Sequence, residues 1–340
     1  MGPAGGPVPA RFVPYSATFV SAGEGWVLGT APCAKPPCTS ILRTRDGGAS
    51  WQGVPAPLAP IGVAYQLGAR AVSTIRFADG SNGWVVGRQL FATHNGGSNW
   101  RLVPLPLDNG VITGLATGGG RVYLSAKSCG YNSPDNCLSH TTVYASVIGA
   151  DEWSPLTTSQ DRSVTENLVA HGSDWYLTTT RGLYHGVGAA APKLVGNPCP
   201  AEGSVVTVPR IAVADARHLD AMCAGGGAGG SASYQLYGTS DGGLHWSKAG
   251  PSRREASGLY GIADNAHGVL LAATASGGSE ILRSTDDGAT LVNAKISTAS
   301  GGLEWTDLGF TTTNQAVVVL SHTALYLSHD AGSTWSQARY

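Results

Sequence analysis

The chain has 340 residues, of which 48 are glycine and 19 are proline, with 13% charged residues and a formal net charge of −1. Lysine and arginine are scattered, with no run longer than Arg253-Arg254, so nucleic acid and anionic membrane surfaces are not expected as partners. No apolar run approaches the ~20 residues that a membrane-spanning helix needs.

The start of the chain and its length set the expected domain organisation. Residues 1–7 are rich in glycine and proline and lack the basic and apolar regions of a signal peptide. We therefore predict a flexible leader over residues 1–10. The rest, residues 11–340, is long enough for one large all-β domain, and we predict a single one.

A strand, a short turn and a second strand recur along the chain. In the first copy Phe19 and Trp26 lie seven residues apart on either side of a turn containing Gly23 and Gly25. The same spacing recurs in the pairs Phe77 and Trp84, Leu115 and Val122, Leu168 and Trp175, Val213 and Asp220, Ile262 and Val269, and Phe310 and Val317. These hairpins predict seven repeats, and only Asp220 is polar where an apolar residue is expected.

An eight-residue pattern, Ser/Thr-x-Asp-x-Gly-x-x-Trp, follows five of the hairpins, at residues 44–51, 93–100, 239–246, 284–291 and 328–335. We call each copy an octet. Its hydroxyl and carboxylate can accept hydrogen bonds from backbone N–H groups, and its glycines allow positive φ. The third octet positions are Asp46, Asn95, Asp241, Asp286 and Asp330. We predict that each octet is a turn between a third and a fourth strand.

Four strands per repeat and seven repeats predict an all-β chain that forms a seven-bladed β-propeller of four-stranded antiparallel blades. The octets resemble the Asp box of bacterial-neuraminidase-repeat propellers, which include sialidases. The phrase Phe-x-x-x-x-x-Gly-Trp-Val-x-Gly at residues 19–29, followed by Arg-Thr-x-Asp-Gly-Gly-x-x-Trp at residues 43–51, is similar to the repeats of photosystem II stability and assembly factors and their non-photosynthetic bacterial relatives. This resemblance implies a non-catalytic extracytoplasmic scaffold. The arginine-rich patch of the photosynthetic members has no recognisable counterpart in this sequence.

Six cysteines occur, and none has the C-x-x-C spacing of a zinc or redox site. Their proximity in the sequence favours three disulfides: Cys33 with Cys38, Cys129 with Cys137, and Cys199 with Cys223. Such pairs predict an oxidising compartment, so we expect a secreted, periplasmic or cell-surface protein. The alternative is a cytoplasmic protein with six reduced, buried thiols.

The connections that follow the second strands are long in repeats one, three and five, and they hold five of the six cysteines. In a propeller these loops share one face, and the octets lie on the other. Long loops that are closed by disulfides on an otherwise regular scaffold indicate a binding site. We call these loops the stapled insertions. We therefore predict that the face with the insertions contacts the partner.

Catalytic motifs are sparse. Residues 238–242 match G-x-S-x-G, but they fall in an octet and not in a strand-to-helix turn, which argues against a serine hydrolase. Residues 11–14 match the Arg-Ile-Pro motif of sialidases only in part. When the seven hairpins are aligned, Arg210 is the one basic residue among the positions at which the first strands begin. A glycosidase needs two carboxyl groups, for which Glu166, Glu255 and Glu304 are weak candidates. Ordinary solvated loop carboxylates are the favoured alternative.

The leading functional hypothesis is a non-catalytic binding propeller for a protein or carbohydrate ligand. We predict that Arg210, Tyr260, Glu304 and Trp305 lie near the mouth of the central funnel. The alternative is a carbohydrate-active enzyme in that funnel, with glycosidase-like or lyase activity rather than true sialidase activity. No cofactor, metal or nucleic acid is expected, and we expect a monomer.

Overall fold

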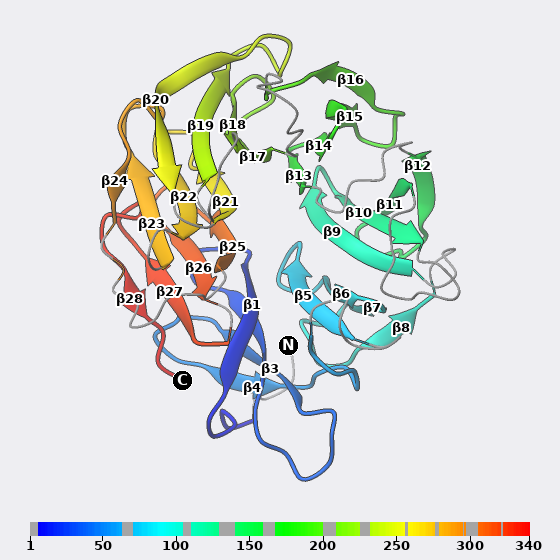
Figure 1. Cartoon of the computed structure of the whole chain (residues 1–340). Helices are drawn as coiled ribbons and strands as arrows, with labels where there is room; N and C mark the ends of the chain where they lie inside the picture. Colours follow the sequence, from blue (N-terminus) through cyan, green and yellow to red (C-terminus); the bar gives the residue numbers. More distant parts are fainter. Residues whose placement is uncertain are drawn as a thin grey trace. The chain divides into compact units, whose positions relative to one another are not determined.

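The computed structural model describes residues 6–62, 71–104, 110–128, 140–158, 167–199, 209–224, 232–255, 258–275, 279–294, 296, 305–320 and 322–340. These residues form seven four-stranded antiparallel sheets, each built from four strands in sequence order (Figure 1). The prediction of a seven-bladed β-propeller without helices is confirmed for the described part of the chain. We number the sheets as blades one to seven along the chain.

The strand bounds are as follows. Blade one contains β1 (Val13–Phe19), β2 (Gly25–Thr30), β3 (Thr39–Thr44) and β4 (Gln52–Val54), and blade two contains β5 (Val72–Phe77), β6 (Gly83–Gly87), β7 (Leu90–Thr93) and β8 (Arg101–Val103). Blade three contains β9 (Gly110–Gly118), β10 (Arg121–Ser128), β11 (Thr141–Val147) and β12 (Ser154–Thr158), and blade four contains β13 (Asn167–His171), β14 (Asp174–Thr179), β15 (Gly182–Val187) and β16 (Lys193–Gly196). Blade five contains β17 (Arg210–Val213), β18 (Leu219–Ala224), β19 (Ala232–Thr239) and β20 (Ser247–Glu255). Blade six contains β21 (Gly258–Asp264), β22 (Leu270–Ala275), β23 (Ser279–Ser284) and β24 (Val292–Asn293), and blade seven contains β25 (Trp305–Phe310), β26 (Ala316–Leu320), β27 (Ala324–Ser328) and β28 (Ser336–Gln337).

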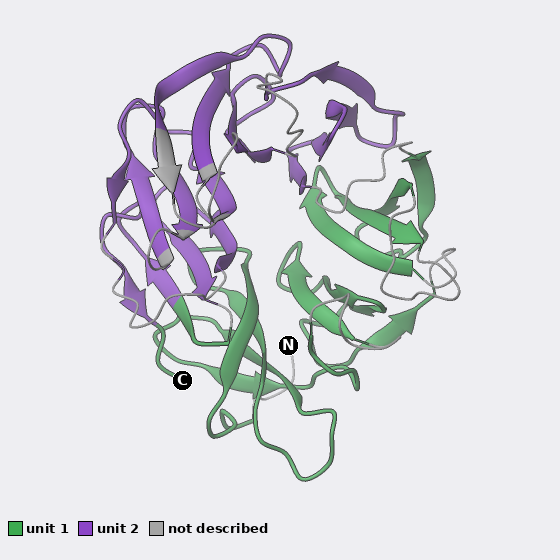
Figure 2. Ribbon diagram, in the orientation of Figure 1, with its two compact units in different colours: residues 1–164, 322–325, 338–340 green, residues 165–321, 326–337 purple. Residues whose placement is uncertain are grey.

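The chain divides into two compact units, which are coloured separately in Figure 2. Unit 1 comprises Met1–Val164, His322–Leu325 and Ala338–Tyr340, and unit 2 comprises Thr165–Ser321 and Tyr326–Gln337. The single domain expected over residues 11–340 stays a prediction. Within the expected leader, residues 1–5 lie outside the described residues, and Gly6 exchanges two backbone hydrogen bonds with Gly53, at 2.8 and 2.9 Å.

The second strands of blades one and seven, β2 and β26, are almost entirely apolar. In β2, Trp26, Val27 and Leu28 are fully buried, and all five residues of β26 are buried as well. Alternate residues of a strand point to opposite faces of its sheet, so an unbroken buried run means that both faces are covered. Both faces of each of these two sheets are therefore packed against other parts of the protein.

The octets form the turns between third and fourth strands, as predicted. In blade one the Thr44 hydroxyl donates to Asp46 Oδ1 at 2.8 Å and accepts from the Gly48 N–H at 2.8 Å, while the Ser50 N–H donates to Asp46 Oδ1 at 2.8 Å. Gly48 has a φ of 94°, which favours glycine. The same hydroxyl-to-third-position bond occurs at Asn95, Asp241, Asp286 and Asp330.

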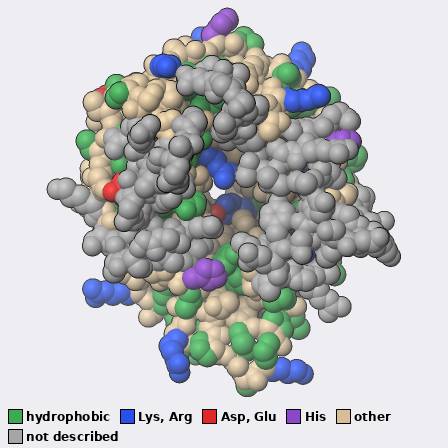
Figure 3. All heavy atoms as spheres, in the orientation of Figure 1, with side chains coloured by type: hydrophobic (Ala, Val, Ile, Leu, Met, Phe, Trp, Pro, Cys, Tyr) green, Lys and Arg blue, Asp and Glu red, His purple; other side chains and the backbone are tan. Residues whose placement is uncertain are grey.

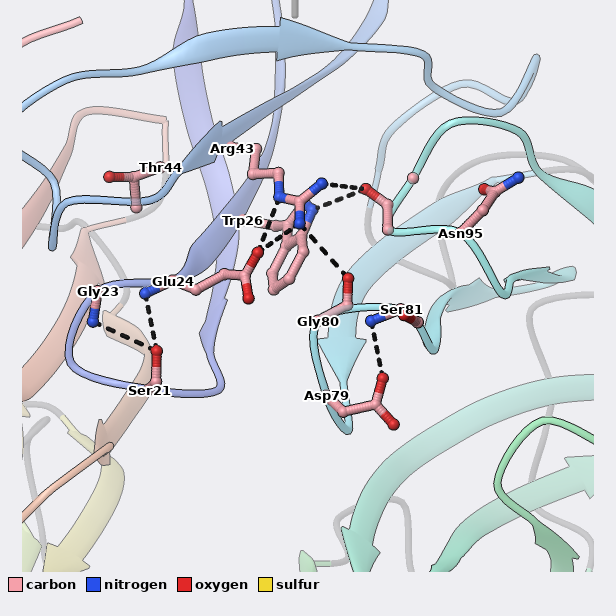
Figure 4. A network of polar contacts seen from close by, with 12 residues as sticks. Ser21, Gly23, Glu24, Trp26, Arg43, Thr44, Asp79, Gly80, Ser81 and Asn95 are labelled. Carbon is pink, nitrogen blue, oxygen red and sulfur yellow. Dashed lines mark hydrogen bonds and ion pairs between the residues drawn. The ribbon is translucent and has the colours of Figure 1, made fainter. Parts of the chain in front are cut away.

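Within unit 1, an aromatic contact joins blade one to blade two. The Trp26 ring stacks on Phe77 with centroids 3.7 Å apart and planes 2° apart, and Trp26 Nε1 donates to the Gly96 carbonyl of the next octet at 3.2 Å. Arg43 lies over the Trp26 ring, pairs with Glu24 and donates to the same carbonyl at 3.4 Å (Figure 4). One indole thus fills the space between two blades and also satisfies a turn carbonyl.

Two of the three predicted disulfides are confirmed. Cys33 is bonded to Cys38 between β2 and β3, and Cys199 is bonded to Cys223 in β18. Cys129 and Cys137 lie outside the described residues, and no free cysteine occurs among the described ones. No helix in the described part of the chain is long and apolar enough to cross a membrane.

The octet carboxylates predict a specific response to acid. Hydrogen bonds from Ser50 and Thr44 lower the pKa of Asp46 to about 2. Because this folded-state pKa is below that of the unfolded chain, the stabilisation is present above pH ~4 and is lost as the pH falls towards 2. The variant Asp46→Asn keeps the turn, as Asn95 does, and removes the titration. Its melting temperature should fall less steeply between pH 4 and 2 than that of the wild type.

Scanning calorimetry at several acidic pH values measures this difference. The matched control is Asn95→Asp, which adds a titrating carboxylate to an equivalent turn and should steepen the acid limb. Parallel acid limbs for wild type and both variants would show that the octet carboxylates do not govern the response.

Candidate functional site

A cavity of about 500 Å³ lies between blades five and six, within unit 2. It is lined by the two hairpin turns that follow β17 and β21, and by the octets of these two blades. Its polar side chains come from Asp215, His218, Asp220, Thr239, Ser240, Ser247, Asp264 and Asp287. The cavity is therefore built at the octet ends of the two blades.

Asp220 occupies the position that Trp26 holds in blade one. Trp26 is the second residue of β2, Trp84 is the second residue of β6, and Asp220 is the second residue of β18. The residue opposite Trp26 on the third strand is Arg43, whereas the residue opposite Asp220 is Gly238. Blade five therefore lacks both side chains that blade one directs at the octet carbonyl of its neighbour.

Asp264 occupies the position that Phe77 holds in blade two. Phe77 is the last residue of β5, and Asp264 is the last residue of β21. In both hairpins the N–H of the following residue donates to a carbonyl of the turn, at 2.9 Å after Phe77 and at 3.2 Å after Asp264. The stacked pair of Trp26 and Phe77 is therefore replaced by two carboxylic acids.

These replacements explain the cavity. The positions that hold Trp26, Phe77 and Arg43 between blades one and two hold much smaller residues between blades five and six. These are Asp220, Asp264 and Gly238, in the same order. A Cβ atom added at Gly238 would meet only Asp220 Oδ1, at 3.4 Å. Asp287 stands where Gly96 stands in blade two, and its φ of 51° lies in the left-handed region that aspartate adopts less readily than glycine.

The carboxyl groups influence each other. Burial, together with a hydrogen bond with Asp264 and the charges of Asp264 and Asp287, raises the pKa of Asp220 to about 8. At the rim, hydrogen bonds from His218 and from the Arg217 N–H lower the pKa of Asp215 to about 2. At neutral pH the cavity thus combines a buried, protonated acid with an ionised carboxylate at its edge.

A resident metal ion finds no suitable ligand set here. No group of three or more His, Cys, Asp or Glu side chains in the described residues could hold a metal ion. The cavity can instead share protons between carboxyl groups and accept hydrogen bonds from an organic cation.

The residues predicted to line a funnel mouth do not form one described cavity. Tyr260 in β21 is partly buried against the core of blades six and seven. Trp305 in β25 is 2% exposed in that core, with Tyr326 edge-on at 6.1 Å, so it contributes to packing. Arg210 in β17 is partly buried, and burial lowers its pKa. Glu166 and Glu304 lie outside the described residues, and for Glu255 only the backbone, paired with Ala232, is described.

In the sequence Asp220 is a visible exception to the apolar pattern, whereas Asp264 is not. The seven-residue spacing predicted that Ile262 and Val269 correspond to Phe19 and Trp26, but the strand pairing shows that Asp264 and Leu271 do. Both pairs are seven residues apart, so spacing alone cannot choose between them. The assumption that both positions are apolar favoured the wrong pair.

Comparison with known proteins gives the fold. No protein family model and no curated protein matches the chain. Among solved structures, YCF48 bound to a D1 peptide has a TM-score of 0.61 and 15% identity over 96% of both chains, and YCF48 from Cyanidioschyzon merolae has 0.60 and 18% over 97% of this chain and 99% of that one. A puromycin hydrolase has 0.56 and 12% over 96% of this chain and 55% of that one. At these identities the likeness shows a shared propeller fold alone.

The Asp220 carboxyl predicts that stability falls with rising pH. Its pKa of about 8 in the folded state exceeds the ~3.9 of an unfolded aspartate, so the folded state binds an extra proton between these values. The free energy of unfolding should therefore fall from pH 5 to pH 9. The variant Asp220→Asn keeps the side-chain size and removes the titration, and its loss over this range should be smaller by about 2 kcal/mol or more.

Urea unfolding at pH 5, 7 and 9 measures the effect. Asp215→Asn is the control, because the low pKa of Asp215 keeps it ionised throughout this range. If the wild type and Asp220→Asn lose the same free energy of unfolding between pH 5 and 9, the protonated pair is not a feature of the folded protein.

Proposed function

We propose that this protein is a non-catalytic binding propeller that recognises a partner protein, and that the cavity between blades five and six receives a basic side chain of that partner. One observation carries the proposal. Where blades one and two meet through a stacked Trp26–Phe77 pair, blades five and six present Asp220 and Asp264 around a cavity of about 500 Å³. That volume is within the range of ligand pockets, about 300 to 1,000 Å³.

The chemistry of the lining favours a cation. Burial is the largest cause of the raised pKa of Asp220, and the carboxyl groups of Asp264 and Asp287 add to it because ionised carboxylates at this spacing repel one another. A guanidinium or ammonium group between them supplies opposite charge and several N–H donors. A lysine or arginine side chain of a partner protein has this head group on a long apolar stem that can reach into a cavity.

Three further findings support an extracytoplasmic protein-binding role. YCF48, which shares the fold, has been solved with a bound D1 peptide. The two disulfides favour an oxidising compartment, so we propose a secreted or cell-surface location. The hydrogen bonds of the octet turns support their assignment as Asp boxes of a bacterial-neuraminidase-repeat propeller.

Nucleic acid is a poor match for this surface. Lysine and arginine side chains stand at separate positions among the described residues visible in Figure 3, without a continuous basic patch there. The proposed cavity is itself acidic and would repel phosphates.

Within unit 2, the proposed cavity and the Cys199–Cys223 disulfide lie at different ends of blade five. Asp220 is near the octet end of β18, whereas Cys223 is near the other end of this strand. Residues 129–137 of the predicted binding face lie outside the described residues. A contact through the insertions therefore stays a prediction, and the cavity adds a second place where the partner can bind.

A carbohydrate-active enzyme is the second candidate function. The raised pKa of Asp220 is what a general acid needs, and a second carboxyl group is adjacent. However, Asp220 and Asp264 are hydrogen-bonded to each other, while glycosidases keep their two carboxyl groups about 5 to 9.5 Å apart. This closeness favours binding over glycoside hydrolysis. A glycan array and a panel of chromogenic glycosides test the alternative directly.

The proposal predicts selective binding of basic peptides. N-acetyl-Gly-Arg-Gly-amide should bind the protein, and N-acetyl-Gly-Gln-Gly-amide should bind at least about tenfold more weakly, because only arginine compensates the carboxyl charge. Isothermal titration calorimetry measures the difference in affinity, with longer peptides that differ only in the same arginine-to-glutamine exchange. The variant Asp264→Phe should abolish binding, because the aromatic ring refills the space that Phe77 occupies in blade two.

Asp241→Asn serves as the matched control. Asp241 belongs to the octet of blade five but does not line the cavity, so this variant should bind as the wild type does. Equal binding of the arginine and glutamine peptides, or full binding by Asp264→Phe, would contradict the proposal. Binding of sugars together with hydrolysis would instead favour the second candidate.

Binding at this site should also depend on pH. The pKa of Asp220 is about 8, so its ionised form becomes the major one only above that pH. A cation stabilises the ionised carboxylate, and the affinity for the arginine peptide should therefore rise from pH 7 to pH 9. Calorimetry at pH 7 in two buffers of different ionisation enthalpy should detect protons released on binding, and Asp220→Asn should release none.

A further inference from the structure

A buried carboxylate joins blades two and three within unit 1. Asp151 lies between β11 and β12, and its side chain is 1% exposed. Its Oδ1 accepts the Trp84 indole N–H at 2.9 Å, while its Oδ2 accepts from Arg101 at 2.6 Å and lies 2.9 Å from His94 Nε2. The Asp151 carboxylate thus receives the indole N–H of blade two, as the Gly96 carbonyl receives that of blade one.

The second ring nitrogen of His94 faces a side-chain amide in the turn between β5 and β6. His94 Nδ1 lies 2.8 Å from Asn82 Oδ1. The Asn82 Nδ2 donates to both oxygens of Asp79, at 3.1 and 2.9 Å. Asp79 also accepts from the Ser81 N–H at 2.7 Å, as Figure 4 shows. The orientation of the Asn82 amide therefore depends on Asp79.

Asp79 accepts hydrogen bonds and donates none. Burial alone would raise its pKa, but hydrogen bonds from Asn82 and Ser81 and the charge of His94 outweigh burial and hold the pKa below its ordinary value. An ionised carboxylate has no proton to donate. Exchanging the amide nitrogen and oxygen of Asn82 would place an oxygen against this carboxylate. Asn82 Oδ1 therefore faces His94.

The His94 ring consequently lies between two acceptors, Asn82 Oδ1 and Asp151 Oδ2. A neutral imidazole has one N–H and one lone pair, whereas an imidazolium has two N–H groups. The charged groups around the ring are Asp79 of the β5–β6 turn, Arg101 of β8 and Asp151 of the β11–β12 connection. Both hydrogen bonds can form together only when each ring nitrogen carries a proton.

We propose that His94 forms a pH-sensitive contact between blades two and three. With both ring nitrogens protonated, it bridges the β5–β6 turn of blade two and Asp151 of blade three. Loss of one proton, in the pH range where histidine side chains titrate, leaves a lone pair facing an acceptor and breaks one of the two hydrogen bonds. The stabilisation is therefore present in mild acid and is lost as the pH rises.

This contact is separate from the binding proposed between blades five and six. It regulates how firmly two other blades are held together. Trp84 and the octet of blade two belong to the same network, so they should be better ordered in acid than in alkali. An extracytoplasmic protein meets such changes of pH more often than a cytoplasmic one does.

Nuclear magnetic resonance of the whole ¹⁵N-labelled protein tests the protonation directly. At pH 5.5 both ring nitrogens of His94 should carry protons. As the pH rises to 8.5, the loss of one proton should coincide with a shift of the Asn82 side-chain amide and faster hydrogen exchange at Trp84 Nε1. His329 is the matched control, because it is exposed and holds the same second octet position in blade seven. Its titration should leave Trp84 unchanged.

Variants test the effect on stability. The difference in melting temperature between wild type and His94→Gln should shrink by at least about 2 °C from pH 5.5 to 8.5. Asp151→Asn should remove this pH dependence, because its amide can present an N–H to a neutral ring. Arg101→Gln should keep the dependence, since His94 still pairs with Asp151. His329→Gln should show no pH-dependent difference from the wild type.

Three results would overturn the proposal. The first is a His94 ring with one unprotonated nitrogen at pH 5.5. The second is a melting-temperature difference between wild type and His94→Gln that is the same at every pH, which would show that His94 only packs between the turns. The third is an unchanged pH dependence in Asp151→Asn.

Discussion

The contact between neighbouring blades is the interaction on which this structure depends. Each blade is a thin sheet, and a sheet of four short strands cannot bury enough apolar surface alone. The stack of Trp26 on Phe77, with the indole N–H bonded to Gly96 O, joins two such sheets and satisfies the turn of the second one. Leu271 and Phe310 pack in one core between blades six and seven, at the same two positions.

The carboxylic acids between blades five and six are a local exception to this apolar packing between neighbouring blades. Asp220 and Asp264 give up apolar contact, and burial makes ionisation of Asp220 costly. Proteins tolerate such costs at functional sites, where stability is exchanged for a charge in a defined place.

The fold and the site were not equally predictable. The hairpin spacing and the octets indicated seven blades and placed Asp46, Asn95, Asp241, Asp286 and Asp330 in turns, because both signals depend on residues close together in the chain. The same spacing marked Asp220 as unusual. It failed at Asp264, where two alignments have equal spacing and only the pairing of Asp264 with Leu270 decides between them.

The sequence by itself determined what local interactions control: strand periodicity, the octet turns, and the Cys33–Cys38 and Cys199–Cys223 disulfides. Only the tertiary structure decided which side chains from different blades meet. Asp220 and Asp264 are 44 residues apart and belong to separate sheets, so no local rule brings them together. Their hydrogen bond, the cavity around them and the raised pKa of Asp220 follow from packing between blades, which depends on the positions of both sheets at once. The burial of Trp305 has the same origin.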